Sequence, residues 1–126
     1  MRVILVLVLA AALGGCGGTP RYRPAPADAV AYQKGTASYY HDSLHGNLTA
    51  SGEPYDRQAL TAAHRSLPFG TRIRVTNLAN GKTVTLTVND RGPFVRGRIV
   101  DVSRRAAHDL GFVREGIVDV AIELVN

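Results

Sequence analysis

The chain has 126 residues, 45% of them hydrophobic, a formal net charge of +5 and a single cysteine. This length fits one domain, and one cysteine excludes an internal disulfide, so packing must stabilise the fold. Residues before Gly35 supply +3 of the charge, which leaves eleven basic and nine acidic side chains from there on. Nucleic-acid binding usually needs a clustered basic face, so this balance argues against a nucleic-acid partner.

The first 15 residues predict a lipoprotein signal peptide. Met1 and Arg2 give a positively charged start. The apolar run 3–13 has the length of a signal-peptide core and is too short to span a bilayer. The small residues before Cys16 resemble a bacterial lipobox, in which this cysteine carries the lipid. The alternative is an ordinary secretory signal, or a buried start helix, with an incidental cysteine.

Residues 16–34 predict a lipidated cysteine followed by a flexible tether. The segment contains three prolines and has no sustained periodicity. An extended chain of this composition reaches on the order of 50 Å. By resemblance to diderm lipoproteins, Gly17 after the cysteine favours the outer membrane, so we expect a lipid-anchored protein of the cell envelope that faces the periplasm.

Residues 35–126 predict a mainly β domain. In chain order, strands are expected over 35–40, 71–76, 82–88, 99–102 and 118–125, with clear alternation of apolar and polar side chains in 71–76, 82–88 and 118–125. Between the second and third of these strands, Asn80 and Gly81 predict a tight hairpin turn with positive φ at both positions.

One helix is expected, over residues 104–110. Ser103 can cap its N-terminus, and Gly111 stands where a left-handed residue ends a helix. One helix among five or six short strands favours a small closed barrel over a layered α/β fold.

Ionisable residues gather in two loop-like stretches, 45–64 and 89–94. Glycine and proline inside each stretch prevent a continuous strand, and polar groups that follow a rigid strand are well placed to act on a ligand. Taken singly, the residues have plainer explanations. Asp90 fits a turn aspartate, Glu53 a solvated loop carboxylate, and His64 a structural histidine.

From Gly35 onward the chain carries an ordered set of short motifs. They are Gly35-Thr36-Ala37-Ser38-Tyr39-Tyr40, Thr49-Ala50-Ser51-Gly52-Glu53, Thr61-Ala62-Ala63-His64, Leu67-Pro68-Phe69-Gly70-Thr71, Val75-Thr76-Asn77, Val88-Asn89-Asp90-Arg91-Gly92-Pro93-Phe94 and Arg98-Ile99-Val100-Asp101-Val102-Ser103. Each motif is weak alone. Together, in this order and across nearly all of the domain, they resemble the rare lipoprotein A family.

The resemblance implies a six-stranded double-psi β-barrel. It also implies a lytic transglycosylase that cleaves peptidoglycan glycan strands, preferring strands without stem peptides, and leaves 1,6-anhydromuramic ends. The residues that the family needs for cleavage match Glu53, His64 and Asp90. Many relatives carry a sporulation-related glycan-binding repeat after the barrel; this sequence has none, so septal targeting through such a repeat is not expected.

The chemistry suits these residue types. Breaking a glycosidic bond needs an acid that protonates the leaving oxygen, and we expect Asp90 to be this acid/base, held neutral at first by partial burial. Glu53 is expected to orient the sugar or support the developing charge, and His64 to hydrogen-bond a carboxylate. Glu53 and Asp90 could exchange roles. Further residues are expected to bind substrate, namely Ser51, Tyr55, Asn89, Arg91 and Tyr39.

Other residues receive structural interpretations. Asp101, on a short strand near Arg98, is expected to form a structural ion pair or to fix a loop. Tyr39, Tyr40, Tyr55 and Phe94 fit a sugar-stacking floor or, nearly as well, core packing. No cofactor is expected, and metal binding through His41 and His45 is disfavoured because no compact ligand motif is present.

Two other functions compete with the lyase, a non-catalytic expansin-like wall-binding or wall-loosening module and a partner-binding lipoprotein. The expected partners are glycan strands and, through Cys16, a membrane. We expect a monomer.

Overall fold

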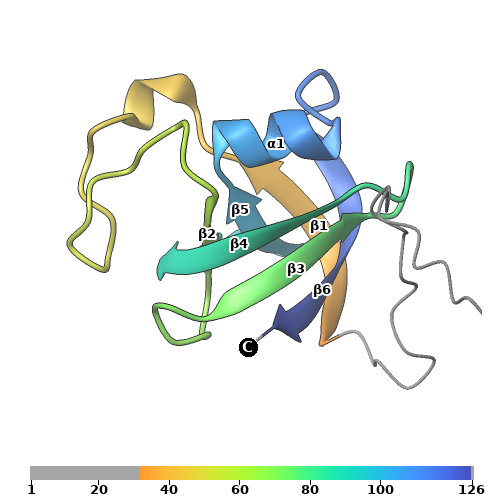
Figure 1. The fold of residues 1–126 in the computed structure, drawn as a ribbon, viewed down its shortest axis with the longest axis horizontal. Helices are drawn as coiled ribbons and strands as arrows, with labels where there is room; N and C mark the ends of the chain where they lie inside the picture. The colour runs from red at the N-terminus through yellow and green to blue at the C-terminus, as the bar shows by residue number, and fades with distance from the viewer. Residues whose placement is uncertain (1–31, 126) are drawn as a thin grey trace, which may run out of the picture.

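The structure is a computed structural model that describes residues 32–125 (Figure 1). The predicted signal peptide, the lipid site at Cys16 and nearly all of the predicted tether lie outside this range. The described residues form six strands, one α-helix and one 3-10 turn: β1 (Gln33–Tyr39), η1 (Asp42–Leu44), β2 (Thr61–His64), β3 (Arg72–Asn77), β4 (Thr83–Asp90), β5 (Arg98–Val102), α1 (Arg104–Leu110) and β6 (Ile117–Val125).

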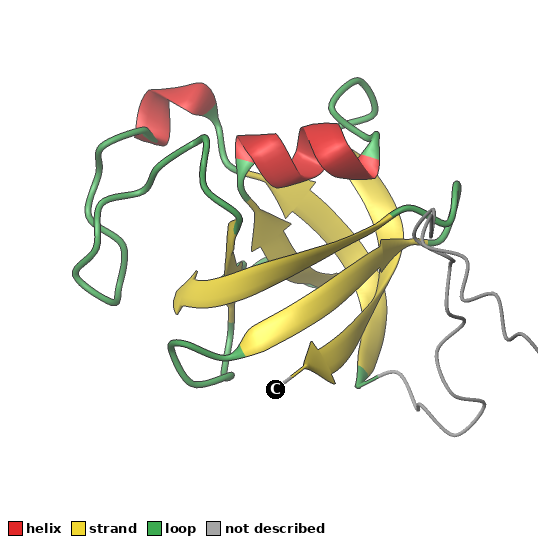
Figure 2. Ribbon diagram, viewed as in Figure 1, coloured by secondary structure: helices red, strands yellow, loops and turns green. Residues whose placement is uncertain are grey.

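The six strands close into one barrel in the order β1-β5-β2-β4-β3-β6 (Figure 2). The pairs β1 with β5 and β2 with β4 are parallel, and the other described pairs are antiparallel. Each parallel pair joins strands that are not consecutive in the chain. Strands from the first and second halves of the sequence therefore lie next to each other in the barrel. The prediction of a mainly β, six-stranded closed barrel with a short helix is confirmed.

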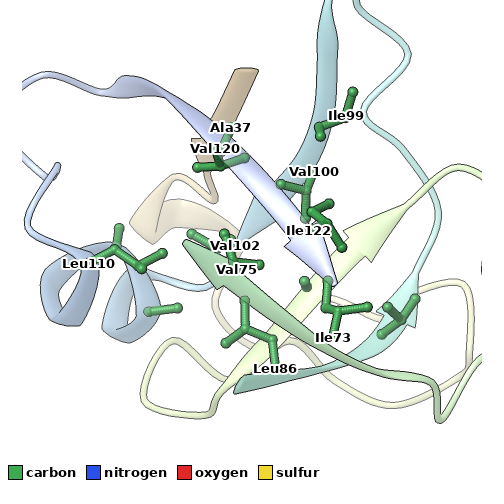
Figure 3. Close-up of a cluster of buried hydrophobic side chains, with 14 of the residues drawn as sticks. Ala37, Ile73, Val75, Leu86, Ile99, Val100, Val102, Leu110, Val120 and Ile122 are labelled. Atoms are coloured by element: carbon green, nitrogen blue, oxygen red, sulfur yellow. The ribbon is translucent and has the colours of Figure 1, made fainter. Parts of the chain in front are cut away.

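Apolar side chains from alternating strand positions fill the barrel (Figure 3). On β3, Ile73 and Val75 are fully buried, and their register partners on β4 are Leu86 and Val84. On β6, Val120 and Ile122 are also fully buried. Burying one such side chain stabilises the fold by about 1.5–3 kcal/mol. The apolar residues that alternate along these strands therefore provide most of the stabilisation.

The helix has the predicted bounds and caps. The Ser103 Oγ accepts a hydrogen bond from the Ala106 amide, and Gly111 adopts a left-handed φ of 75°. Ala106, Ala107 and Leu110 are the buried face of α1, which lies across one end of the barrel (Figure 1). At that end, the helix closes the core.

The turn between β3 and β4 differs from the prediction. In this turn only Gly81 has a positive φ, 76°. Asn80, predicted to share it, does not, since no described non-glycine residue has a positive φ. The Gly81 amide donates to the Asn77 carbonyl over 2.7 Å, which makes a wider loop. The side-chain amides of Asn77 and Asn80 instead donate to the Leu110 carbonyl at 2.8 and 2.9 Å. Asn80 therefore helps to hold the end of α1.

Two further differences concern strand boundaries. The sequence did not predict β2, whose four residues Thr61–His64 include two alanines and do not alternate. β1 begins at Gln33, because Gln33 and Lys34 already pair with Ile122 and Ala121. Gln33 and Lys34, predicted to belong to the tether, therefore belong to the barrel. Within the described part of the chain, no helix has the length and apolar character needed to cross a membrane.

Candidate active site

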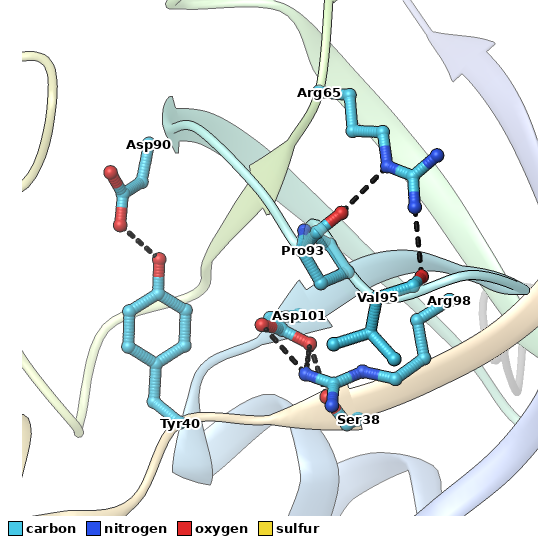
Figure 4. A network of polar contacts seen from close by, with 8 residues as sticks. All are labelled: Ser38, Tyr40, Arg65, Asp90, Pro93, Val95, Arg98 and Asp101. Carbon is cyan, nitrogen blue, oxygen red and sulfur yellow. Dashed lines mark hydrogen bonds and ion pairs between the residues drawn. The ribbon is translucent and has the colours of Figure 1, made fainter.

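Asp90 ends β4, and both of its carboxylate oxygens accept hydrogen bonds. Oδ2 accepts from the Tyr40 hydroxyl at 2.5 Å (Figure 4). Oδ1 accepts from the amide of Ala50 at 2.8 Å and from that of Arg91 at 2.9 Å. Three donors from three separate segments thus fix the orientation of one half-buried carboxylate.

The ring of Tyr40 is held in place by a second tyrosine. Its ring stacks on that of Tyr55 with the centroids 4.3 Å apart and an interplanar angle of 18°. Tyr55 is 2% exposed, and its hydroxyl accepts from the Arg104 amide at 3.1 Å. Burial raises the pKa of Tyr40 well above its usual value, and so do its hydrogen bond to Asp90 and the nearby carboxylates. The Tyr40 hydroxyl therefore stays a proton donor at any physiological pH.

An open cleft of about 390 Å³ lies beside this pair. Its walls combine charged and aromatic side chains, including Tyr39, Tyr40, Asp90, Arg91, Phe94, Arg98 and Asp101. Phe94 on the rim is 79% exposed. A cleft of a few hundred Å³ with a few converging polar groups is the usual form of a small-ligand site.

Asp101 is a second carboxylate in this cleft. It accepts from the Ser38 hydroxyl and from Arg98 Nη2, the latter at 2.9 and 3.2 Å to its two oxygens (Figure 4). The predicted ion pair with Arg98 is therefore confirmed. The sequence did not reveal that Asp101 shares a cleft with Asp90; the signal was available only in the parallel pairing that sets β5 beside β1.

His64 is buried and is not among the residues that line the cleft. The ring is 3% exposed; its Nδ1 accepts from the amides of Ser66 and Leu67, both at 3.1 Å. Its Nε2 lies 2.9 Å from Oε1 of Gln33, so the neutral ring carries its hydrogen on Nε2. Burial lowers the pKa of His64, and the charges of Arg91 and Arg65 lower it further. The expected hydrogen bond to a carboxylate is wrong, because these groups occupy both ring nitrogens.

His64 instead orders a turn that supports the loop after Asp90. The Arg91 guanidinium donates to the carbonyls of Leu67 and His64 at 2.8 and 3.3 Å and lies 4.1 Å from the centroid of the Phe69 ring. Arg65 donates to the carbonyls of Pro93 and Val95 at 2.6 and 2.8 Å (Figure 4). Arg91, predicted to bind substrate, lines the cleft, while its guanidinium contacts the turn after His64 and the Phe69 ring.

Glu53 belongs to a tight turn that packs on the end of β4. The Thr49 amide and hydroxyl both donate to the Glu53 carbonyl, at 2.9 and 2.7 Å. The Ser51 amide donates to the carbonyl of Asn89 at 3.2 Å. Glu53 is exposed and is not among the residues that line the cleft. The turn thus brings Glu53 to the neighbourhood of Asp90 without placing the two carboxylates in one cleft.

The other predicted substrate-binding residues divide into two groups. Tyr39 lines the cleft, although its hydroxyl donates to the Val113 carbonyl at 2.8 Å. Ser51 is partly exposed, and its Oγ lies 2.9 Å from that of Thr49. Tyr55 and Asn89 are buried, so they support the site from behind. In residues 32–125, no cluster of three or more histidine, cysteine or acidic side chains is arranged to hold a metal ion.

Comparison with known proteins gives concordant results. Residues 32–122 match the family described as lytic transglycolase. Over 105 residues the chain is 50% identical to the endolytic peptidoglycan transglycosylase RlpA of Neisseria meningitidis serogroup A, covering 83% of this chain and 44% of that protein. Over 92 residues it is 52% identical to the probable endolytic peptidoglycan transglycosylase RlpA of Synechocystis sp., covering 73% and 29%. The chain therefore spans less than half the length of these curated relatives.

The barrel also has a solved counterpart. The apo structure of a Clavibacter michiganensis expansin superposes with a TM-score of 0.58 at 27% identity, covering 74% of this chain and 50% of that one.

Proposed function

Because the chain belongs to the lytic transglycolase family of double-psi β-barrels, we propose that it cleaves peptidoglycan glycan strands as a lytic transglycosylase. The observation that carries the proposal is the carboxylate of Asp90, which three donors hold beside an open cleft. The proposed product is a 1,6-anhydromuramic end, and the proposed preference is for strands without stem peptides, as the family resemblance implies.

In the proposed reaction Asp90 acts first as acid and then as base. Its proton passes to the leaving glycosidic oxygen as the bond from that oxygen to C1 of muramic acid breaks. The C6 hydroxyl of the same sugar attacks C1, and its proton returns to Asp90, so no water is consumed. Between the two steps Asp90 is an anion. Tyr40 and the amides of Ala50 and Arg91 stabilise that anion because all three donate to it.

Positive charge builds on the sugar ring during this reaction. Asp101 lies in the same cleft as Asp90, and Arg98 and Ser38 hold it in place. Its proposed role is to stabilise that positive charge electrostatically. Glu53 is exposed on the turn that packs against Asp90, and its proposed role is to contact the sugar as the strand binds.

The proposed location is the cell envelope. The lipobox-like sequence that ends at Cys16 and the proline-containing segment after it support a lipid anchor with a flexible tether. Such an arrangement keeps the cleft within reach of a polymeric substrate that lies close to the membrane.

The test incubates the purified full chain with stripped glycan strands and identifies the products by mass spectrometry. Release of 1,6-anhydro ends by the wild type, abolished in Asp90→Asn and retained in Glu115→Gln, supports the proposal. Glu115 is an exposed acid outside the cleft, which makes it a matched control. Reducing ends would instead indicate hydrolysis, in which water attacks with the help of a second carboxylate such as Asp101.

A non-catalytic wall-binding module is the second candidate, and the structural likeness to an expansin favours it. Strands that co-sediment with the protein but stay uncut, in the wild type as in Asp90→Asn, would support this candidate and overturn the lyase.

A further inference from the structure

A second cleft lies next to the first, and arginine dominates its walls. It measures about 430 Å³ and is formed by the loop at Arg57 and by residues of α1. The turn η1 separates the two clefts, since Asp42 lines this one and Leu44 lines the cleft of Asp90. Its ionisable residues are Arg57, Arg104, Arg105, His108, Asp42 and Asp109. We call it the arginine cleft.

The charges of the arginine cleft do not cancel. Arg104 lies 3.7 Å from a carboxylate oxygen of Asp42, and Arg105 lies 3.7 Å from one of Asp109. For Arg57, no carboxylate of the described residues lies within ion-pair distance. One positive charge is therefore left over while histidine is neutral.

This balance selects the kind of anion that the cleft can take. A guanidinium group matches the two oxygens of a carboxylate in a paired geometry. A multiply charged phosphate would meet repulsion from Asp42 and Asp109, whereas a single carboxylate matches the single excess charge. A volume of about 430 Å³ also falls within the range of roughly 300–1,000 Å³ that is usual for ligand pockets.

The two clefts are connected through aromatic packing. The Arg104 guanidinium lies 5.4 Å from the centroid of the Tyr39 ring, and Tyr39 lines the cleft of Asp90. The two clefts therefore adjoin at this contact, and a linear polymer that ran from Asp90 past η1 would next meet the arginine cleft.

We propose that the arginine cleft binds a carboxylate of the glycan strand at least one sugar away from the bond that is cut. The inference rests on the proposed function, because it takes the strand to be peptidoglycan. Two groups on that polymer carry this chemistry. One is the lactyl carboxylate of a muramic acid that has no stem peptide, and the other is the terminal carboxylate of a stem peptide.

The test measures binding of end-labelled glycan strands to the purified full chain by fluorescence anisotropy. The probes are stripped strands, stripped strands with their carboxyls converted to neutral amides, and strands that retain stem peptides. In the variant Arg57→Gln with Arg105→Gln, the Kd for stripped strands is expected to rise about tenfold. Amidation of the strands should weaken wild-type binding equally and leave the variant unaffected. Arg72→Gln, an exposed arginine on β3 outside both clefts, should bind like the wild type.

The outcomes separate the two sources and the two proposals. A loss in the variant that is confined to peptide-bearing strands supports the carboxylate site and assigns it to the stem peptide. Equal Kd values for variant and wild type on all three probes overturn it.

In cleavage assays, the variant is expected to raise KM and keep kcat. Carboxylate-dependent binding without any anhydro ends would overturn the lyase alone, and normal cleavage with carboxylate-independent binding would overturn the arginine cleft alone.

Discussion

The Tyr40 hydroxyl donates to Oδ2 of Asp90 over 2.5 Å, and the Tyr40 ring lies flat on that of Tyr55. A donor on a stacked, largely buried ring loses little freedom when the carboxylate gains or loses a proton. Such preorganised donors are effective at stabilising charge that changes during a reaction.

Replacing Tyr40 with phenylalanine is expected to lower kcat for release of anhydro ends by about tenfold to a hundredfold. A hydrogen bond to a charged group is worth roughly 1.5–3 kcal/mol, and each 1.36 kcal/mol is about a factor of ten in rate. KM should change little, because phenylalanine keeps the stack on Tyr55. Steady-state kinetics on stripped strands measure both constants. A variant with wild-type kcat would show that the hydroxyl is only structural.

The same tyrosine makes the fold sensitive to alkali. The pKa of Tyr40 is raised above the usual 10.0, mainly by burial and by Asp90, and burial also raises that of Tyr55. Above about pH 10 the unfolded chain releases these protons while the folded chain keeps them, so the free energy of unfolding must fall as the pH rises. Urea unfolding between pH 8 and pH 11 measures this fall. Tyr40→Phe should flatten the dependence, and an unchanged slope in that variant would contradict the shift.

The fold could be predicted largely because its strands alternate. In three of the predicted strands, every second residue is apolar, and these residues fill the barrel. The three strands are those over 71–76, 82–88 and 118–125. Ser103 and Gly111 give the helix its bounds by cap chemistry that is local in sequence. β2 escaped prediction because its alanines are buried without alternating. The start of β1 escaped because Gln33 and Lys34 pair with β6, far along the chain.

The position of Asp90 in the site could be predicted from the sequence, but the surroundings of His64 and Asp101 could not. A strand that ends in a polar turn marks Asp90 in the sequence. The role of His64 depends on the turn that follows it, and the cleft position of Asp101 depends on non-local pairing of β1, β5 and β2. Single-sequence patterns carry neither signal. They therefore led to a predicted carboxylate partner for His64 and to a purely structural interpretation of Asp101.

Two replacements of His64 separate its structural role from a chemical one. Asparagine can offer an oxygen near the position of Nδ1 and so retain the hydrogen bonds from the amides of Ser66 and Leu67; alanine cannot. We expect His64→Asn to keep most of kcat and His64→Ala to lose most of it, because the turn that binds Arg91 is released. Thermal unfolding should follow the same order. If His64→Asn were as inactive as His64→Ala but fully folded, the ring itself would have to take part in the reaction.

His64 also makes stability depend on acid. Its pKa is lowered from 6.5 by burial first and by Arg91 and Arg65 next. Below pH 6.5, His64 therefore binds a proton in the unfolded chain but stays neutral in the folded chain. The free energy of unfolding is highest above that pH and falls as the pH drops toward the folded-state pKa. Urea unfolding of wild type and His64→Asn from pH 7.5 to pH 4.5 tests this point. The variant should lose less stability over that interval, and parallel curves would refute the assignment to His64.

The cap of α1 provides a prediction about stability that does not involve the cleft. The Ser103 side chain is fully buried, donates to the Ala59 carbonyl at 2.5 Å and accepts from the Ala106 amide at 3.2 Å. Ser103→Ala leaves both groups without a partner, which should cost about 1–3 kcal/mol of unfolding free energy. Chemical denaturation measures the loss, with Ser66→Ala as the control because Ser66 is exposed. Since α1 closes one end of the barrel, a loss below about 0.5 kcal/mol would mean that the helix is held by its apolar face alone.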